Sequence, residues 1–143
     1  MKIISWNIKG LNNPHKKDMV RNMIRDNKLD IVLIQDTKMP KDKVEILFFF
    51  SSGKKLGSDV DGASSGMAII WNDKIIHGEL LYQSRNMINV IFLNNKDNTS
   101  WVQTNVYAPN TKWGRKSCWI ETTYHRRDFA DEDWVSMGIS THL

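Results

Sequence analysis

The stretch that decides the fold is Asp-Ile-Val-Leu-Ile-Gln-Asp-Thr-Lys, residues 30–38. Four consecutive apolar residues at 31–34, mostly β-branched, are followed at once by the polar Gln35 and Asp36. A short, uninterrupted apolar run is typical of a strand that is covered on both faces. Polar residues at the carboxyl end of such a strand lie where ligands and catalytic groups gather in layered α/β folds. Asp36 is the first residue there whose carboxylate could hold a hard cation.

The chain before this run predicts a parallel pair of strands joined by a helix. Residues 2–8 are rich in β-branched and aromatic residues and predict a first strand, with Asn7 near its exit. Asn13 and Pro14 form a helix start, because Asn caps well and Pro suits the first helical position. The apolar residues that follow at helical spacing predict one stripe: Met19, Val20, Met23 and Ile24. A strand–helix–strand order implies parallel strands with a helical crossover.

The pattern after residue 38 changes from helix to strand. Pro40 predicts a short helix over 41–50, whose Phe48–Phe50 cluster we expect in the core, and residues 51–66 are rich in turn formers and predict a loop. Strands are predicted at 67–71, 75–82, 87–93 and 100–107, the last three as antiparallel hairpins, and another at 134–137. A loop and a helix are predicted within 110–129, with an inner stripe of Trp119, Ile120, Thr123 and Tyr124.

Composition sets the class of protein. The 143 residues are 41% hydrophobic and 25% charged, which predicts a single globular domain over residues 1–143. The net charge of +4 is compatible with a polyanionic partner without requiring one. Cys118 is the single cysteine, so no internal disulfide can form. There is no signal-peptide pattern and no apolar run near the ~20 residues needed to cross a membrane. We therefore expect a soluble, intracellular protein of the nucleus or cytoplasm.

Three short motifs occur in an order that is typical of one family. They are Ser-Trp-Asn at 5–7, Gln-Asp-Thr at 35–37 and Tyr-Ala-Pro-Asn at 107–110. Together they resemble the endonuclease/exonuclease/phosphatase superfamily of metal-dependent phosphodiesterases. More narrowly, the chain resembles the endonuclease domain of plant LINE-type retrotransposons, which also carry a Trp- and Arg-bearing helix like Trp-Gly-Arg at 113–115. The resemblance covers essentially the whole chain and implies an α/β sandwich of two packed sheets with helices outside.

The resemblance also implies a chemistry, namely hydrolysis of DNA phosphodiester bonds with Mg²⁺ or Mn²⁺. Asp36 takes the position of the family's metal-binding glutamate, and Asn7 would orient that ligand or the attacking water. Tyr107 would stabilise a phosphate oxygen, and Asn110 would hold substrate beside it. Taken singly, Asn7 also suits a turn cap, Asp36 a turn acid and Tyr107 a half-buried strand tyrosine. Three basic residues would contact backbone phosphates or form a solvated helix face: Lys112, Arg115 and Lys116.

Three departures from the family pattern predict impaired or absent catalysis. Asp36 is shorter than glutamate by one carbon–carbon bond, roughly 1.5 Å, which predicts weak or absent Mg²⁺ binding. Gly138 is followed by Ile-Ser-Thr at 139–141, where the family has an Asp and an Asn. The Ser-Asp-His motif that carries the general base has no counterpart before Leu143, so we expect a truncated domain.

A truncated domain would have an incomplete second sheet. Such a sheet would leave an apolar face exposed, and we expect a partner or self-association to cover it. Three functional interpretations stay open at this stage: an active endonuclease, a non-catalytic nucleic-acid-binding remnant, and a decayed element without function. Other phosphoester substrates of the superfamily are a further alternative.

Overall fold

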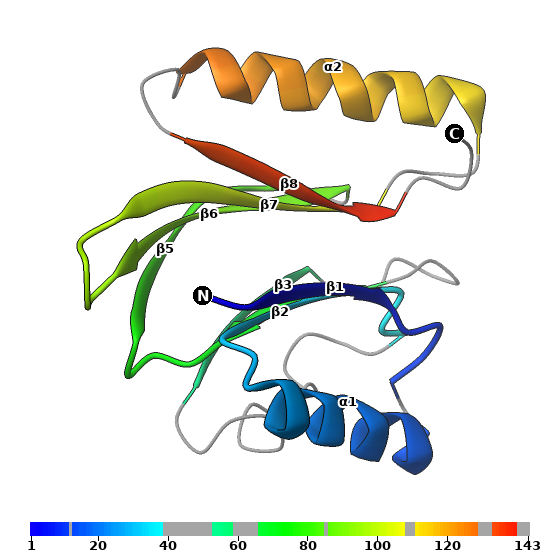
Figure 1. Ribbon diagram of the computed structural model, residues 1–143. Helices are drawn as coiled ribbons and strands as arrows, with labels where there is room; N and C mark the ends of the chain where they lie inside the picture. The colour runs from blue at the N-terminus through cyan, green and yellow to red at the C-terminus, as the bar shows by residue number, and fades with distance from the viewer. Residues whose placement is uncertain are drawn as a thin grey trace.

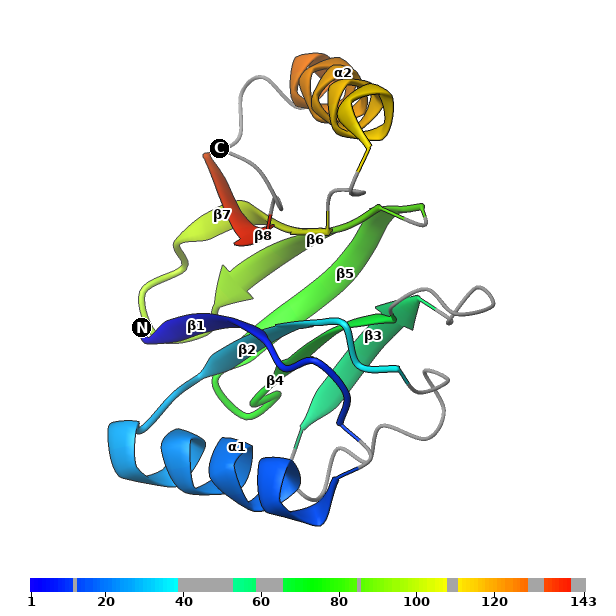
Figure 2. The ribbon, with the colours of Figure 1, turned by 90° about the vertical axis from the view of Figure 1, so that its right-hand side faces the viewer.

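The computed structural model describes residues 1–11, 13–38, 53–58, 66–84, 86–107, 111–128 and 133–139. Figure 1 shows two sheets packed face to face between two helices. Helix α1 lies outside one sheet and α2 outside the other, and the same four layers are visible from the side in Figure 2. The predicted two-sheet α/β sandwich is therefore confirmed. The elements in chain order are β1 (Ile3–Asn7), α1 (Pro14–Asn27), β2 (Ile31–Gln35), β3 (Lys54–Ser58), β4 (Met67–Trp71), β5 (Ile76–Gln83), β6 (Met87–Asn94), β7 (Ser100–Tyr107), α2 (Lys112–Asp128) and β8 (Trp134–Ile139).

The first sheet is organised around β2, as the apolar run predicts. Its strand order is β1-β2-β4-β3, and all five residues of β2 are buried. Strand β1 pairs with β2 in parallel and β4 pairs with it antiparallel. Alternate side chains of β2 point to opposite faces. Val32 and Ile34 pack toward α1, whereas Ile31 and Leu33 pack toward the second sheet.

Helix α1 begins where the sequence predicts. The Asn13 side chain accepts a hydrogen bond from the His15 N–H at 2.9 Å, and Pro14 is the first helical residue. Val20 and Ile24 are buried against the first sheet. Met19 corrects the predicted apolar stripe, because its side chain is 53% exposed.

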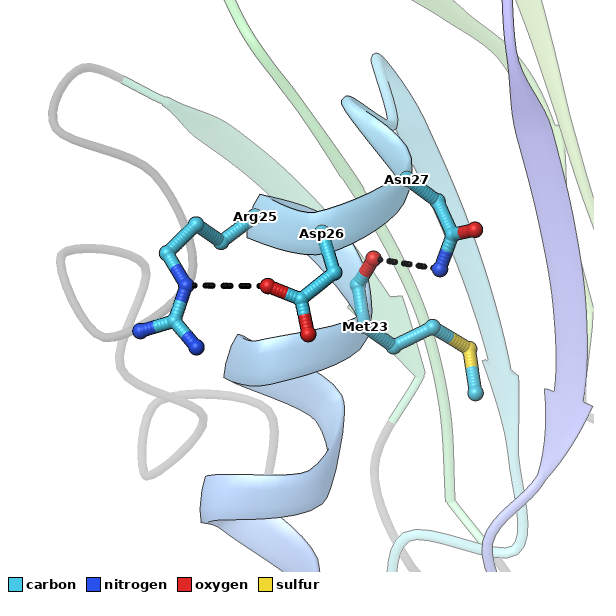
Figure 3. Close-up of polar contacts among 4 residues, drawn as sticks. All are labelled: Met23, Arg25, Asp26 and Asn27. Carbon is cyan, nitrogen blue, oxygen red and sulfur yellow. Dashed lines mark hydrogen bonds and ion pairs between the residues drawn. The ribbon is translucent and has the colours of Figure 1, made fainter.

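The end of α1 is closed by local contacts (Figure 3). Arg25 Nε lies 3.1 Å from Asp26 Oδ1, and Asn27 Nδ2 donates to the Met23 carbonyl at 3.0 Å. Lys28 adopts a left-handed conformation with φ of 52°, and its N–H points back to the Arg25 carbonyl. The chain then turns directly into β2, which fixes the crossover between the two parallel strands.

The second sheet has the order β5-β6-β7-β8. Strands β5, β6 and β7 form the predicted antiparallel hairpins, and β8 pairs with β7 in parallel. Its inner face supplies Ile88, Val90 and Phe92 to the core that it shares with the first sheet. Burial between the two sheets is the main apolar contact of the molecule and sets their relative position.

Two predicted elements need correction. The predicted loop at 51–66 contains a strand, β3, which is held by antiparallel pairing to β4 rather than by any apolar pattern of its own. Helix α2 turns Cys118 inward, at 1% exposure, while Trp119 and Ile120 are 58% and 61% exposed. Thr123 is exposed as well, so the predicted inner stripe is wrong where its side chains are described. The predicted helix at 41–50 lies outside the described residues.

The expectation of a bare sheet face also needs correction for the described strands. The inner faces of the two sheets cover each other, and the outer faces carry α1 and α2 (Figures 1 and 2). Large exposed apolar side chains lie on α2 and at the margins of the second sheet instead: Leu80, Leu93, Trp113, Trp119, Ile120 and Val135. Neither α1 nor α2, the helices of the described part of the chain, is long and apolar enough to span a membrane.

Candidate functional site

The carboxyl ends of β1 and β2 bring Asn7 and Asp36 to one edge of the first sheet. Asn7 lies opposite Gln35 in the parallel register, and Asp36 is the next residue after Gln35. The segments that follow the two strands remain bonded to each other. The Gly10 N–H donates to the Asp36 carbonyl at 2.7 Å and the Leu11 N–H to the Thr37 carbonyl at 2.8 Å. Two residues that are 29 positions apart in sequence therefore share one small region, as predicted.

Asp36 has an unusual backbone conformation. Its φ is 59°, in the left-handed region that L-residues other than Asn, Asp and Gly rarely adopt. The peptide before Asp36 is held by the Gln35 carbonyl, which accepts from the Ile8 N–H at 3.1 Å. The peptide after it is held twice, because the Asp36 carbonyl accepts from the Gly10 N–H and the Thr37 N–H donates to the Gly66 carbonyl at 3.0 Å. Strained residues of this kind cost of order 1–3 kcal/mol and gather at functional sites. The half-buried Asp36 carboxylate forms no ion pair with the described residues.

Strand β7 brings Tyr107 to the same end of the molecule from the other sheet. At the start of β2, Ile31 pairs with Trp71 of β4. At the start of β7, Trp101 pairs with Phe92 of β6. The Trp71 and Phe92 rings are in contact, so the starts of β2 and β7 lie at the same end of the molecule. At the other end of β2, the Gln35 side chain contacts Asn105. Strand β7 thus runs in the same direction as β2, and Tyr107 lies two residues beyond Asn105.

A buried polar contact joins the sheets directly beneath this edge. Gln35 Nε2 donates to Asn105 Oδ1 at 2.6 Å and also lies 2.9 Å from Ser5 Oγ on β1. Asn105 Nδ2 points the other way and donates to the carbonyls of Ile34 and Ala68 at 3.2 and 3.1 Å. Gln35 and Asn105 are each at most 1% exposed. One network therefore connects β1, β2, β4 and β7 below Asn7 and Asp36.

The sequence reasoning did not assign a role to Asn105 or to Ser5. A signal was present, because Asn105 and Tyr107 are two residues apart on one predicted strand and therefore share a face. A buried polar residue on the face of a predicted site residue is a candidate for supporting that site. Which groups it contacts depends on the other sheet, and no local pattern reveals that.

Asn7 makes the local contact expected of a turn cap. Its Oδ1 accepts from the Lys9 N–H at 3.3 Å, a long hydrogen bond. The turn is held from behind by Lys16, whose Nζ donates to the carbonyls of Ile8 and Lys9 at 2.8 and 2.7 Å. The structure therefore shows Asn7 as a turn cap, one of the two roles predicted for it. A second lone pair on its amide oxygen remains for a ligand.

The other predicted site residues differ in where the structure places them. Tyr107 is half-buried against the core between the sheets, and Asn110 lies outside the described residues. Helix α2 is capped by Thr111, whose Oγ1 accepts from the Gly114 N–H at 3.0 Å. Lys112 and Lys116 are exposed, whereas Arg115 is half-buried. The structure thus separates the three basic residues into an outer pair and an inner one.

The fit to a divalent cation is partial. Within the residues that the structure describes, no three His, Cys, Asp or Glu side chains are placed to bind one metal. The edge offers the Asp36 carboxylate and the Asn7 amide oxygen, both of the oxygen type that Mg²⁺ prefers. Mg²⁺ commonly keeps several waters and uses only one or two carboxylates. These residues fit a hydrated, weakly held cation rather than a closed metal cage.

The fold and this edge define a four-layer α/β sandwich with a polar site where strands of both sheets end. The family model of the Endonuclease/Exonuclease/phosphatase family matches residues 4–141, and the chain belongs to that family. A search of curated proteins gave no match to this sequence.

Solved structures show the same fold at low sequence identity. A functionally unknown conserved protein from Enterococcus faecalis V583 is 16% identical, with a TM-score of 0.73 over 96% of this chain and 66% of its own. The 3′ phosphatase NExo (D146N) from Neisseria, bound to a product DNA hairpin, is 20% identical, with a TM-score of 0.67 over 96% and 56%. The endonuclease domain of TRAS1, a telomere-specific non-LTR retrotransposon, is 13% identical, with a TM-score of 0.70 over 95% and 57%.

The chain spans 56–66% of the length of these three structures. At these identities the likeness establishes the fold alone.

Proposed function

We propose that this chain carries a divalent-cation-dependent site for phosphodiester cleavage in DNA, of the retrotransposon endonuclease type, with impaired turnover. The observation that carries the proposal is that Asn7 and Asp36 share one edge of the first sheet, while β7, joined to β2 through Gln35 and Asn105, ends with Tyr107 at the same end of the molecule. Membership of the family supports it.

Each residue has a distinct role in the proposed reaction. Asp36 would hold Mg²⁺ or Mn²⁺, which would neutralise charge that develops on the phosphate oxygens. Asn7 would orient that carboxylate by donating from its Nδ2, or would orient the attacking water by accepting at the second lone pair of its Oδ1. Tyr107 would donate a hydrogen bond from its hydroxyl to a phosphate oxygen, and Asn110 would hold the neighbouring part of the substrate. Lys112 and Lys116 would contact backbone phosphates, since both are exposed.

Two features support impaired turnover. The Asp36 carboxylate is drawn back from the position that a glutamate would reach, which weakens a site that already fits the cation only partly. The sequence after Gly138 reads Ile-Ser-Thr, so β8 leads into residues without the charge or the amide of the family's Asp and Asn. General base catalysis needs a titratable group beside the attacking water, and Ile-Ser-Thr at 139–141 supplies none.

The test is nicking of a supercoiled plasmid in Mg²⁺ and in Mn²⁺. The full chain is compared with Asp36→Ala and Tyr107→Phe, and with Asp18→Ala as a matched exposed aspartate on α1. We expect slow nicking that both site variants abolish and the control retains. Nicking that is equally fast in all four proteins would overturn the proposal.

A second candidate is a non-catalytic DNA-binding protein. The exposed Lys112 and Lys116 and the net charge of +4 favour it. Salt-dependent retention of DNA without any nicking, in either metal, would support this alternative over the enzyme.

A further inference from the structure

Helix α2 has one buried side and one side that the described residues leave uncovered. Cys118 faces the second sheet, where it packs with Met87. On the other side Trp113 is 74% exposed, and Trp119 and Ile120 are exposed to similar degrees. Figures 1 and 2 show α2 as an outermost layer, with no helix or strand beyond it. Two tryptophans on one bare helix face are a large apolar surface for a single element.

Two lysines of α2, Lys112 and Lys116, lie between these tryptophans around the helix. At 3.6 residues per turn, Trp113, Lys116 and Ile120 form one stripe along the helix. Lys112, Lys116 and Trp119 form a neighbouring stripe, so Lys116 belongs to both. The structure agrees, because Lys116 Nζ lies 5.8 Å from the centre of the Trp113 ring, within reach of a cation–π interaction.

No carboxylate balances the charge on this face over residues 112–123. The acidic residue in that stretch is Glu121, which lies on the inner side of the helix near Cys118 and Tyr82. The outer face therefore combines two exposed lysines with flat aromatic surfaces. This face is complementary to a polyanion that also presents flat, apolar groups.

We propose that the outer face of α2, formed by Lys112, Trp113, Lys116, Trp119 and Ile120, binds an unpaired nucleic-acid strand. The lysines contact phosphates and the indole rings stack on bases, an interaction worth about 1–3 kcal/mol per base. A duplex hides its base faces inside the helix, so the aromatic half of this surface favours a single strand. The choice of DNA as the natural partner rests on the proposed function.

The face is close enough to the candidate site to act on the same strand. Strand β7 ends at Tyr107 and α2 begins at Lys112. Five residues span at most about 17 Å when fully extended. A strand whose phosphate lies at Tyr107 could therefore continue onto the first turn of α2 within a few nucleotides.

The test is binding of a 20-nucleotide oligothymidine to the full chain in EDTA, followed by intrinsic tryptophan fluorescence and by anisotropy of an end-labelled copy. EDTA makes the result independent of nicking, so failure here and failure of the nuclease proposal are distinguishable. We expect quenching on binding and a loss of at least tenfold in affinity for Trp113→Ala/Trp119→Ala. Lys112→Ala/Lys116→Ala should reduce the slope of log affinity against log salt by about 1.4.

Matched controls come from exposed residues far from α2 in sequence. Leu80→Ala removes an exposed apolar side chain and Lys74→Ala an exposed lysine, and both should bind as the parent chain does. Circular dichroism checks that the variants keep their helix content. Unchanged affinity in the double tryptophan variant, tighter binding of a duplex of the same length, or stronger quenching by phosphatidylserine vesicles than by oligothymidine would each overturn the proposal.

Discussion

Gln35 of β2 and Asn105 of β7 are joined by a 2.6 Å hydrogen bond between their side-chain amides. The bond crosses from one sheet to the other, and both residues are buried. An apolar contact would tolerate sliding of one sheet over the other. The Gln35–Asn105 hydrogen bond fixes a single position, because Gln35 is also bonded to Ser5 and Asn105 to the Ala68 carbonyl. The position of Tyr107 relative to Asp36 therefore depends on this pair.

Replacing Asn105 by Ala should destabilise the fold by about 2–4 kcal/mol. The change removes the bond to Gln35 and leaves the carbonyls of Ile34 and Ala68 without their side-chain donor. Urea unfolding measures the effect. Asn22→Ala on the exposed surface of α1 is the matched control and should stay within about 0.5 kcal/mol of the parent chain. A decrease of less than about 1 kcal/mol in the free energy of unfolding for Asn105→Ala would show that the contact contributes little to stability.

Replacing Asp36 by Gly or Asn should separate stability from cation binding. Both residues accept the left-handed conformation at φ of 59°, so neither should destabilise the fold, and Gly could stabilise it by about 1 kcal/mol. Both lose the carboxylate and should lose Mn²⁺ binding, as followed by electron paramagnetic resonance. Asp36→Val has no such tolerance and should destabilise by about 1–2 kcal/mol. Equal stability of the Val and Gly variants would refute the strained conformation.

Lengthening the same side chain should strengthen the candidate metal site. Asp36→Glu moves the carboxylate outward by roughly 1.5 Å. We expect half-saturation at a Mn²⁺ concentration several-fold lower than for the parent chain, and faster plasmid nicking. Asp18→Glu on the surface of α1 is the control and should change neither quantity. Weaker binding by Asp36→Glu would argue against this edge as the metal site.

Gly78 should not tolerate even a methyl group. A Cβ at this position would lie 2.8 Å from Phe92 Cε1 and 2.9 Å from Trp71 Cζ2. These rings already pack edge to face with centroids 5.2 Å apart, so they cannot retreat freely. We expect Gly78→Ala to cost about 1–3 kcal/mol in thermal or urea unfolding. Combining it with Phe92→Leu should cost less than the sum of the two single changes, and strict additivity would contradict the proposed clash.

Cys118 should make stability fall in alkaline solution. Burial first and the nearby Glu121 charge second raise the pKa of its thiol from 9.0 to about 11. Below about pH 9 the Cys118 thiol is protonated in both the folded and the unfolded chain, so its contribution to the free energy of unfolding is constant. Between about pH 9 and 11 the unfolded chain loses the thiol proton and the folded chain keeps it, so stability decreases by on the order of 1–3 kcal/mol.

The measurement for Cys118 compares urea midpoints at pH 8 and pH 10.5 with those of Cys118→Ala. Burial and Glu121 also raise the pKa of Tyr82, which adds to the alkaline loss in both proteins. The difference between parent and variant therefore isolates the thiol. An identical pH dependence in the two proteins would show that the thiol ionises as freely in the folded state as in the unfolded one.

Much of the fold was encoded locally and could be predicted. The apolar run at 31–34 determined a strand buried on both faces, because no polar face exists to leave in water. Asn13 and Pro14 determined the start of α1 through the geometry of a helix end. Alternating patterns and turn residues determined the three hairpin strands, and the motif order indicated the family to which the chain belongs.

Other features were decided only by the tertiary structure. Strand β3 forms because it pairs along the open edge of β4, and its sequence, Lys-Lys-Leu-Gly-Ser, does not predict a strand by itself. The turn of α2 that buries Cys118 and exposes Trp119 depends on which side chains fit against the second sheet. The partners of Asn105 come from β2 and β4, many residues away. Sequence patterns report which residues avoid water, whereas the choice of partner is made by the surfaces that folding brings together.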